Sequence, residues 1–266
     1  MKSLILIRGG GDLATGVAVR LFRSGLKLVV TELEQPLAVR RAVAFSEAIY
    51  EGECTVEGIT AWRAQNPTEA KNFLAQNQIP VMTDPRAEIL SALDFSVVID
   101  ARLLKKTPES LSYSVPLHIG LGPGFHAGEN CHAVIETRRS HTLGRVYWNG
   151  TTQADSGQPE GDPRRVLRAP ATGILISHAN IADHLEEGQL IAEVNNAPVI
   201  SPFKGVLRGL IHDGIQVNKG LKIGDIDPRD DASACFLVSD KSLAIGGGVL
   251  EAILSKPELH SKLWGT

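Results

Sequence analysis

The sequence has little of what builds disulfide frameworks, nucleic-acid surfaces or membrane spans. Its 266 residues include 3 widely spaced cysteines, an odd number that excludes a fully paired disulfide framework. The formal net charge of −3 offers no cationic surface for nucleic acid or an anionic membrane. No apolar run approaches the roughly 18 residues of a transmembrane helix, and no charged-then-apolar leader precedes the first strand. We therefore expect a cytoplasmic protein without a nucleic-acid or membrane partner.

The chain begins with an apolar strand that runs into a glycine-rich turn and then a helix predicted over 13–23. The turn meets the dinucleotide-binding pattern G-x-G-x-x-G/A, in which glycines let the backbone approach a pyrophosphate. An acidic residue ends the next strand about 20 residues later, where a ribose hydroxyl would bind. The alternative is that these glycines serve only close packing. The candidate cofactor-binding residues here are Arg8, Gly9, Gly10, Gly11, Asp12 and Glu32, with Arg8 neutralising Asp12.

Strands alternate with helices over the next hundred residues, which predicts parallel βαβ units. Helices are expected over 37–45, 67–74 and 86–93, and a buried strand over 95–100. Asp100 ends that strand, and ligands of open α/β sheets bind at the carboxyl ends of strands. It is therefore a candidate site residue, although a carboxylate that only caps a loop would fit as well.

A second glycine-rich loop contains Gly120, Gly122 and Gly124, which we interpret as a further candidate ligand cradle. The polar residues His126, Cys131 and His132 follow it, and with Asp100 they are the candidate catalytic residues. A thiolate at Cys131 would suit a soft ligand, whereas a buried, inert cysteine is the plainer interpretation. The histidine and cysteine spacings do not match a structural zinc site, so no metal site is expected.

The third region contains an internal repeat with an offset of 32 residues. Residues 170–175 match 202–207, and residues 185–194 match 217–226 without a gap. A duplication of short strands suits a small closed β unit, and the spacing resembles the biotinyl/lipoyl-like barrel-sandwich hybrid. In the carrier proteins of that family, the hairpin between the halves presents a lysine for attachment. The corresponding stretch here, 194–199, has no lysine, which argues against a carrier of a covalent group.

Several longer motifs resemble the accessory-protein family of selenium-dependent molybdenum hydroxylases. They are residues 8–16, 120–137, 222–229 and 246–254, and the resemblance spans nearly the whole chain. It implies a Rossmann-type protein that acts in maturation of a molybdenum hydroxylase or its cofactor. It also implies a hydroxylase apoenzyme as partner and a molybdopterin dinucleotide as a candidate cofactor, but it supplies no catalytic residues.

Two other functions stay open at this point. An NAD-dependent oxidoreductase would need a proton donor from Asp100, His126 or His132, and a non-catalytic scaffold would need none. Whether the chain is an enzyme, and whether it forms homo-oligomers, are also open.

The predicted fold is α/β, with an N-terminal Rossmann-like parallel sheet and a C-terminal all-β barrel-sandwich module. The predicted regions are a nucleotide-binding domain (1–116), a glycine-rich β region and linker (117–165), the barrel-sandwich module (166–232), and a terminal strand and helix (233–266).

Overall fold

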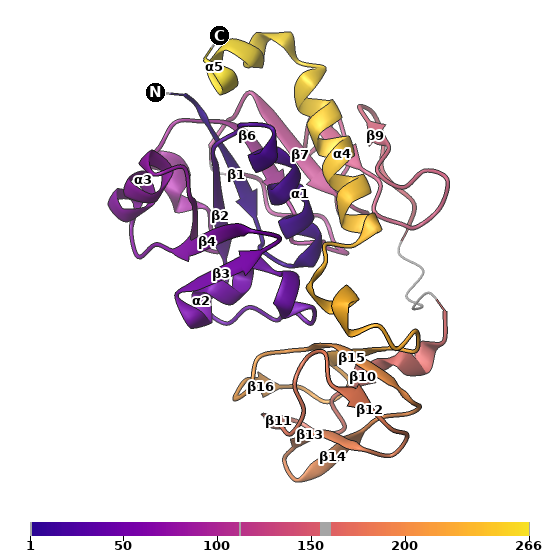
Figure 1. The fold of residues 1–266 in the computed structure, drawn as a ribbon. Coiled ribbons are helices and arrows are strands. Elements are labelled where there is room, and N and C mark those ends of the chain that lie inside the picture. Colours follow the sequence, from indigo (N-terminus) through magenta and orange to yellow (C-terminus); the bar gives the residue numbers. More distant parts are fainter. Residues whose placement is uncertain (1, 112, 155–160, 266) are drawn as a thin grey trace. The chain divides into compact units, whose positions relative to one another are not determined.

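A computed structural model describes residues 2–111, 113–154 and 161–265 (Figure 1). The chain divides into two compact units. Unit 1 comprises Met1–Pro36, Phe45–Asp155 and Val238–Thr266, and unit 2 comprises Leu37–Ala44 and Ser156–Leu237.

Unit 1 is built on one nine-stranded mixed sheet, in the order β3-β4-β5-β2-β1-β6-β7-β8-β9. Its central strands are parallel, whereas β3 and β9 run antiparallel to their neighbours at the two edges. The predicted α/β class is confirmed, and the predicted Rossmann-like parallel sheet is corrected to a mixed sheet. The strands are β1 (Leu4–Arg8), β2 (Leu28–Glu32), β3 (Glu53–Val56), β4 (Ile59–Arg63), β5 (Ile79–Thr83), β6 (Phe95–Asp100), β7 (Leu117–Leu121), β8 (Ala133–Ile135) and β9 (Val146–Tyr147).

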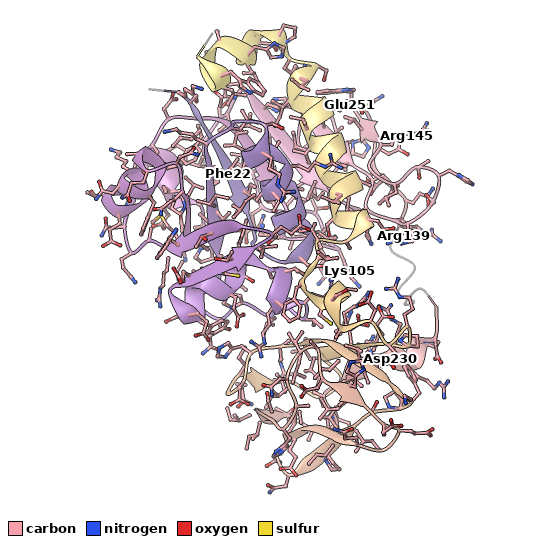
Figure 2. The ribbon with its side chains drawn as sticks, in the orientation of Figure 1. Phe22, Lys105, Arg139, Arg145, Asp230 and Glu251 are labelled. Atoms are coloured by element: carbon pink, nitrogen blue, oxygen red, sulfur yellow. The ribbon has the colours of Figure 1, made fainter. Side chains whose placement is uncertain are left out.

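Helices cover both faces of this sheet, because its central strands are apolar on both sides. Leu6, Val29 and Val98 share a core with residues of α3 on one face. On the other face, α4 packs against β8 and lies beside α1 (Figure 1). Close to the start of α4, Arg139 donates two hydrogen bonds to Asp240, at 2.6 and 2.7 Å (Figure 2). The helices are α1 (Asp12–Arg23), α2 (Ala48–Glu51), α3 (Pro67–Ala75), α4 (Asp240–Leu254) and α5 (His260–Trp264), with 3-10 turns η2 (Phe45–Glu47), η3 (Glu88–Ser91) and η6 (Pro257–Leu259).

Two of the predicted helices are absent from their expected places. Residues 37–45 contain only the 3-10 turn η1 (Arg41–Val43), and residues 86–93 contain only η3. The predicted strand near residue 235 is instead the 3-10 turn η5 (Ala232–Phe236). The helix over 86–93 fails for a local reason: Ala87 is left-handed (φ 57°), and the Asp84 carboxylate accepts from the amides of Glu88 and Ile89.

Unit 2 bears out the 32-residue repeat strand by strand. The order of one sheet is β10-β17-β15-β12, and that of the other is β14-β13-β11-β16. Each strand of the first sheet corresponds to the strand at the same place in the second, so two sequence halves form two equivalent antiparallel sheets. The strands are β10 (Val166–Arg168), β11 (Gly173–Ser177), β12 (His184–Leu185), β13 (Leu190–Val194), β14 (Ala197–Ile200), β15 (Gly205–Leu210), β16 (Gln216–Val217) and β17 (Lys222–Asp227), with the turn η4 (Pro163–Arg165) before β10.

Among the helices of the described residues, none combines the length and the apolar character that crossing a bilayer requires.

Glycines let α4 approach its neighbours closely. A Cβ on Gly248 would lie 2.0 Å from the Gly144 carbonyl oxygen, and one on Gly246 would lie 3.0 Å from the Gly16 carbonyl oxygen. A Cβ on Gly247, between them, would meet nothing within 4 Å. At Gly246 and Gly248, close backbone contact offsets the low helix propensity of glycine. At Gly247 no such contact offsets it.

Adjacent glycines of α4 give a matched test. We expect Gly248→Ala to lower the free energy of unfolding by roughly 1–3 kcal/mol, because the new Cβ overlaps backbone that cannot move freely. Gly247→Ala should raise it by about 0.5–1 kcal/mol through helix propensity alone. Urea unfolding followed by circular dichroism measures both, and effects of the same sign would contradict this packing.

Candidate ligand site at the carboxyl edge of the large sheet

A buried charge cluster lies at the carboxyl ends of the neighbouring strands β1 and β6. The Asp100 carboxylate is fully buried and lies 3.2 Å from Nη1 of Arg8. Arg102 reaches the same carboxylate with Nε at 2.9 Å and Nη2 at 2.6 Å, in the two-pronged geometry typical of strong Arg–carboxylate pairs. Asp100 therefore holds two guanidinium groups, one from the adjacent strand and one from the loop that follows its own strand.

The two arginines differ in which of their hydrogen-bond donors have no partner. The Arg8 side chain is 6% exposed, and its Nη2 donates to the Pro85 carbonyl, but its Nε is buried without a partner. Burial lowers the pKa of Arg8, an effect that the nearby Asp100 charge opposes. The Arg102 side chain is 24% exposed, and within the described chain its Nη1 makes no hydrogen bond. One cation is thus locked in the protein, while the other presents a free donor.

His118 of β7 lies in the electrostatic range of this cluster. Its ring is buried against the edge of the Phe125 ring, and its Nε2 is buried without a partner. Burial lowers the pKa of His118 from 6.5 to about 4, with Asp100 as the main opposing influence. His118 is therefore neutral at pH 7, with a ring nitrogen that finds no hydrogen-bond partner in the described protein.

The N-terminal glycine turn is closed largely by the protein itself. The Glu32 carboxylate, expected to bind a ribose, accepts from the Gly10 amide at 2.6 Å and the Leu33 amide at 2.8 Å. Burial raises the pKa of Glu32, and these two amide donors oppose that rise. A Cβ on Gly10 would lie 2.9 Å from the Ser46 amide nitrogen, so the chain's own backbone occupies that approach.

The neighbouring glycines differ in the space around them. Gly9 has a φ of +92°, and a Cβ there would lie 3.2 Å from the Ala101 carbonyl oxygen. Gly11 has open space, and it caps α1 without a side-chain hydrogen bond. Asp12 is the first helical residue rather than the cap. Of the three glycines, only Gly11 leaves room for a ligand, and a role of the turn in binding stays a prediction.

The second glycine-rich loop packs against its own chain. A Cβ on Gly120 would fall 2.1 Å from the Phe125 ring, and one on Gly124 would fall 2.3 Å from the Leu104 carbonyl oxygen. Gly122 has a φ of +84° and lies against the Thr137 hydroxyl. These approaches explain why glycine is required at each position without a ligand, and ligand binding at this loop stays a prediction.

The remaining candidates do not form one constellation. Cys131 is buried beside Phe125, and burial raises the pKa of its thiol to about 11. His126 contacts Glu129 and Asn130 of its own loop, and the exposed His132 accepts the His118 backbone amide on its Nδ1 at 2.8 Å. A reactive cysteine is usually partly exposed and has a stabilised thiolate, whereas Cys131 is buried and burial disfavours its charged form.

Two residues of the cluster, Arg102 and His118, were missed by sequence reasoning. The signals were weak but present. Arg102 comes two residues after Asp100 at the end of a strand, and His118 is a single polar residue within an otherwise apolar strand. A polar residue inside a buried strand is a sign of a specific local role, because its burial has a cost unless it is paired.

Comparisons with known proteins give one sequence relative and several weak structural likenesses. No family model matches the chain. The chain is 46% identical over 255 residues to the uncharacterized protein YqeB of Escherichia coli (strain K12), which covers 94% of this chain and 47% of that protein. The chain thus spans about half the length of this relative.

The solved structures matched include an aspartoacylase family protein from Mesorhizobium loti, with a TM-score of 0.26, 11% identity and 85% of each chain covered. They also include the ectoine utilization protein EutE from Ruegeria pomeroyi, with a TM-score of 0.24, 9% identity, and 85% of this chain and 86% of that one covered. A third is succinylglutamatedesuccinylase/aspartoacylase from Rhodobacter sphaeroides, with a TM-score of 0.25, 12% identity and 85% of each chain covered.

These findings correct the family resemblance drawn from the sequence motifs. Three of the matched structures bear the names of aspartoacylase or succinylglutamate desuccinylase proteins and another is the ectoine utilization protein EutE, rather than molybdenum hydroxylase accessory proteins. The predicted maturation role, the molybdenum and selenium association and the NAD-dependent oxidoreductase alternative are corrected by the same findings. At TM-scores of 0.24–0.26, no activity passes from these proteins to this chain.

The pKa of His118 predicts a pH-dependent stability. Between pH 7 and pH 5 the unfolded state takes up a proton at this histidine, whereas the folded state does not until about pH 4. The free energy of unfolding should therefore fall by about 2 kcal/mol over this interval through His118 alone. Urea unfolding at both pH values should show this loss shrink in His118→Gln but persist in the exposed control His141→Gln. An unchanged loss in His118→Gln would contradict a neutral buried ring.

Burial of the thiols predicts slow alkylation of the native protein. A pKa of about 11 for Cys131 leaves roughly a hundredfold less thiolate at pH 8 than the ordinary value of 9.0. The pKa of Cys54 is raised further, to about 12, again mainly by burial. We expect iodoacetamide to label both much more slowly than in urea, as followed by peptide mass spectrometry. Rapid labelling of Cys131 in the native state would restore it as a reactive thiol.

Proposed function

We propose that unit 1 binds a small molecule carrying a carboxylate or a phosphate at the carboxyl edge of its sheet. The observation that carries the proposal is the pair of arginines held on one buried carboxylate, next to a neutral histidine with an unpartnered nitrogen. The free Nη1 of Arg102 would anchor the anion by a charge-assisted hydrogen bond. Its guanidinium is already fixed by Asp100, so little conformational freedom would be lost on binding.

The energetics of the cluster support this proposal. Burying the Arg8 guanidinium and the Asp100 carboxylate, together with part of Arg102, has a large desolvation cost, and an apolar cluster of similar volume is often at least as stable. Each buried polar atom left without a partner costs a further ~1–3 kcal/mol. Open α/β sheets bind ligands at this edge, where a bound anion would find donors already in place.

The protonation state of His118 favours hydrogen bonding to a bound ligand over removal of a proton from it. A histidine with a pKa of about 4 is a weak base at pH 7, since general bases work best when their pKa lies near the working pH. Neutral His118 would instead donate or accept one hydrogen bond and fix the orientation of the ligand.

We further propose that unit 2 is a barrel-sandwich hybrid that carries no attached group. Its two equivalent antiparallel sheets support that layout. The β13–β14 hairpin turns on Asn195 and Asn196, both with positive φ (51° and 61°), as in a type I′ turn. A lysine for covalent attachment is absent from this turn.

Arg102 gives the sharpest test of the anion site. Thermal unfolding is measured with inorganic phosphate, acetate and citrate against sodium chloride of equal ionic strength, which removes general screening. At least one anion should raise the melting temperature of the wild type. Arg102→Met should weaken its apparent affinity roughly tenfold to a hundredfold, the value of a hydrogen bond to a charged group.

Two further variants control this experiment. Arg102→Lys keeps the charge without the planar fork and should retain part of the affinity. Arg63→Met, at an exposed arginine of β4 that makes no ion pair in the described chain, should behave as the wild type. If no anion stabilises beyond chloride, or if Arg102→Met responds as Arg63→Met does, the proposed site is wrong.

A further inference from the structure

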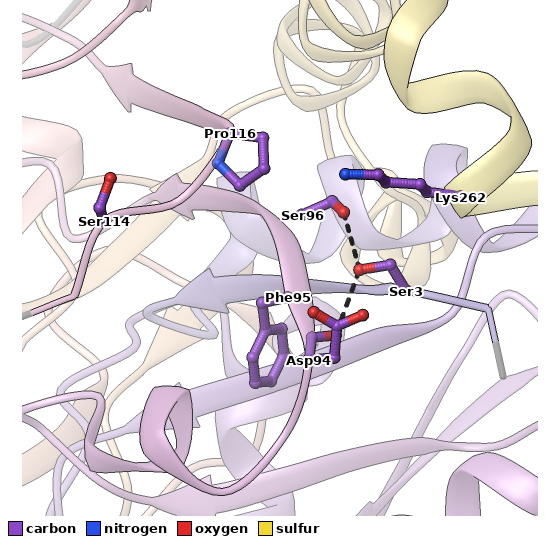
Figure 3. A pocket seen from close by; sticks show the side chains of 7 residues that line it. All are labelled: Ser3, Asp94, Phe95, Ser96, Ser114, Pro116 and Lys262. Atoms are coloured by element: carbon purple, nitrogen blue, oxygen red, sulfur yellow. Dashed lines mark hydrogen bonds between the residues drawn. The ribbon is translucent and has the colours of Figure 1, made fainter.

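A pocket opens at the amino-terminal edge of the large sheet, opposite the edge that holds the Asp100 cluster. It has a volume of about 360 Å³ and is lined by Ser3, Asp94, Phe95, Ser96, Pro116 and Lys262, among others (Figure 3). Ser3 precedes β1, Asp94 and Phe95 stand at the start of β6, and Lys262 belongs to α5. The backbone bond from the Ser3 amide to the Lys262 carbonyl, at 2.9 Å, fixes α5 against this edge.

The buried hydroxyl groups of this pocket form a chain of hydrogen bonds in which each donor points toward the Asp94 carbonyl oxygen. Ser96 Oγ donates to Ser3 Oγ at 2.7 Å, and Ser3 Oγ donates to the Asp94 carbonyl at 3.3 Å. Both serines are almost fully buried, at 2% and 3% exposed. Ser96 Oγ donates a hydrogen bond and accepts none in the described chain. Its lone pairs can therefore accept a hydrogen bond from a ligand.

The two charged side chains of the pocket stand on either side of this pair (Figure 3). Asp94 and Lys262 are both exposed, and neither forms an ion pair within the described residues. They are opposite in charge and lie at one cavity, yet they do not neutralise each other. A ligand with a cationic donor and an anionic group would satisfy both.

We infer that this pocket binds a small zwitterion, an α-amino acid with an apolar side chain. The ammonium group would bind the Asp94 carboxylate and the open Ser96 oxygen, and the carboxylate would bind the Lys262 ammonium. Phe95 and Pro116 supply apolar wall for the side chain. A volume of about 360 Å³ has ample room for a molecule of this size. This site shares no residue with the anion site at the other edge, so either can fail without the other.

Titration calorimetry with L-leucine as the probe tests the inference. Two analogues each remove one charge: 4-methylpentanoate lacks the ammonium group, and 3-methylbutylamine lacks the carboxylate. L-leucine should bind the wild type in the millimolar range or tighter, and each analogue should bind more weakly.

The variants assign each charge to its residue. Lys262→Met should weaken L-leucine binding roughly threefold to fivefold and leave 3-methylbutylamine unchanged, as expected for a solvated ion pair. Asp94→Asn should weaken the binding of L-leucine and leave the binding of 4-methylpentanoate unchanged. Lys71→Met, on the exposed surface of α3, should have no effect. The inference is overturned if L-leucine gives no saturable heat, or if Lys262→Met and Asp94→Asn bind it as the wild type does.

Discussion

The buried carboxylate of Asp100 is the constraint on which the carboxyl edge of unit 1 depends. It joins the ends of β1 and β6 through Arg8 and fixes the following loop through Arg102. Removing it would leave two guanidinium groups without their counter-ion, one of them almost fully buried, which is far costlier than losing a surface ion pair. The same loop places the Ala101 carbonyl oxygen 3.2 Å from where a Cβ of Gly9 would lie, at a position whose φ of +92° also favours glycine.

Much of the fold could be predicted from the sequence because local patterns determine it. The helix predicted over 13–23 begins one residue later than the observed α1, and the apolar strands predicted before and after it are β1 and β2. Residues 37–45 have helical spacing too, yet they form only a short 3-10 turn. There the segment packs on β15, with a bond from Arg41 Nε to the Leu210 carbonyl at 3.1 Å, and this tertiary contact overrides the spacing.

The candidate site was predicted only in part. A glycine pattern indicates that a group lies close to the backbone, but it does not show whether that group is a ligand or another part of the protein. At Gly10 it is the Ser46 amide, and at Gly120 it is the ring of Phe125. The motif 222–229 has a similar explanation. Asp225 pairs with Arg208, and Asp227 holds Arg229 at 2.9 Å, which lowers the pKa of Asp227 to about 2. Motifs that suggested a shared family therefore have structural causes within this chain.

The duplication in unit 2 allows equivalent residues of the two halves to be compared, which shows which positions packing constrains. The equivalent inner residues Leu175 and Leu207 are both fully buried, since each fills the space between the two sheets. Equivalent outer residues differ: Ile174 is 47% exposed, whereas Val206 is fully buried, because η1 and η5 of the same unit pack on β15. The repeat could be read from the sequence because the inner positions and the turns kept their residue types. The outer faces could not be read in this way, since their burial depends on segments far away in the chain.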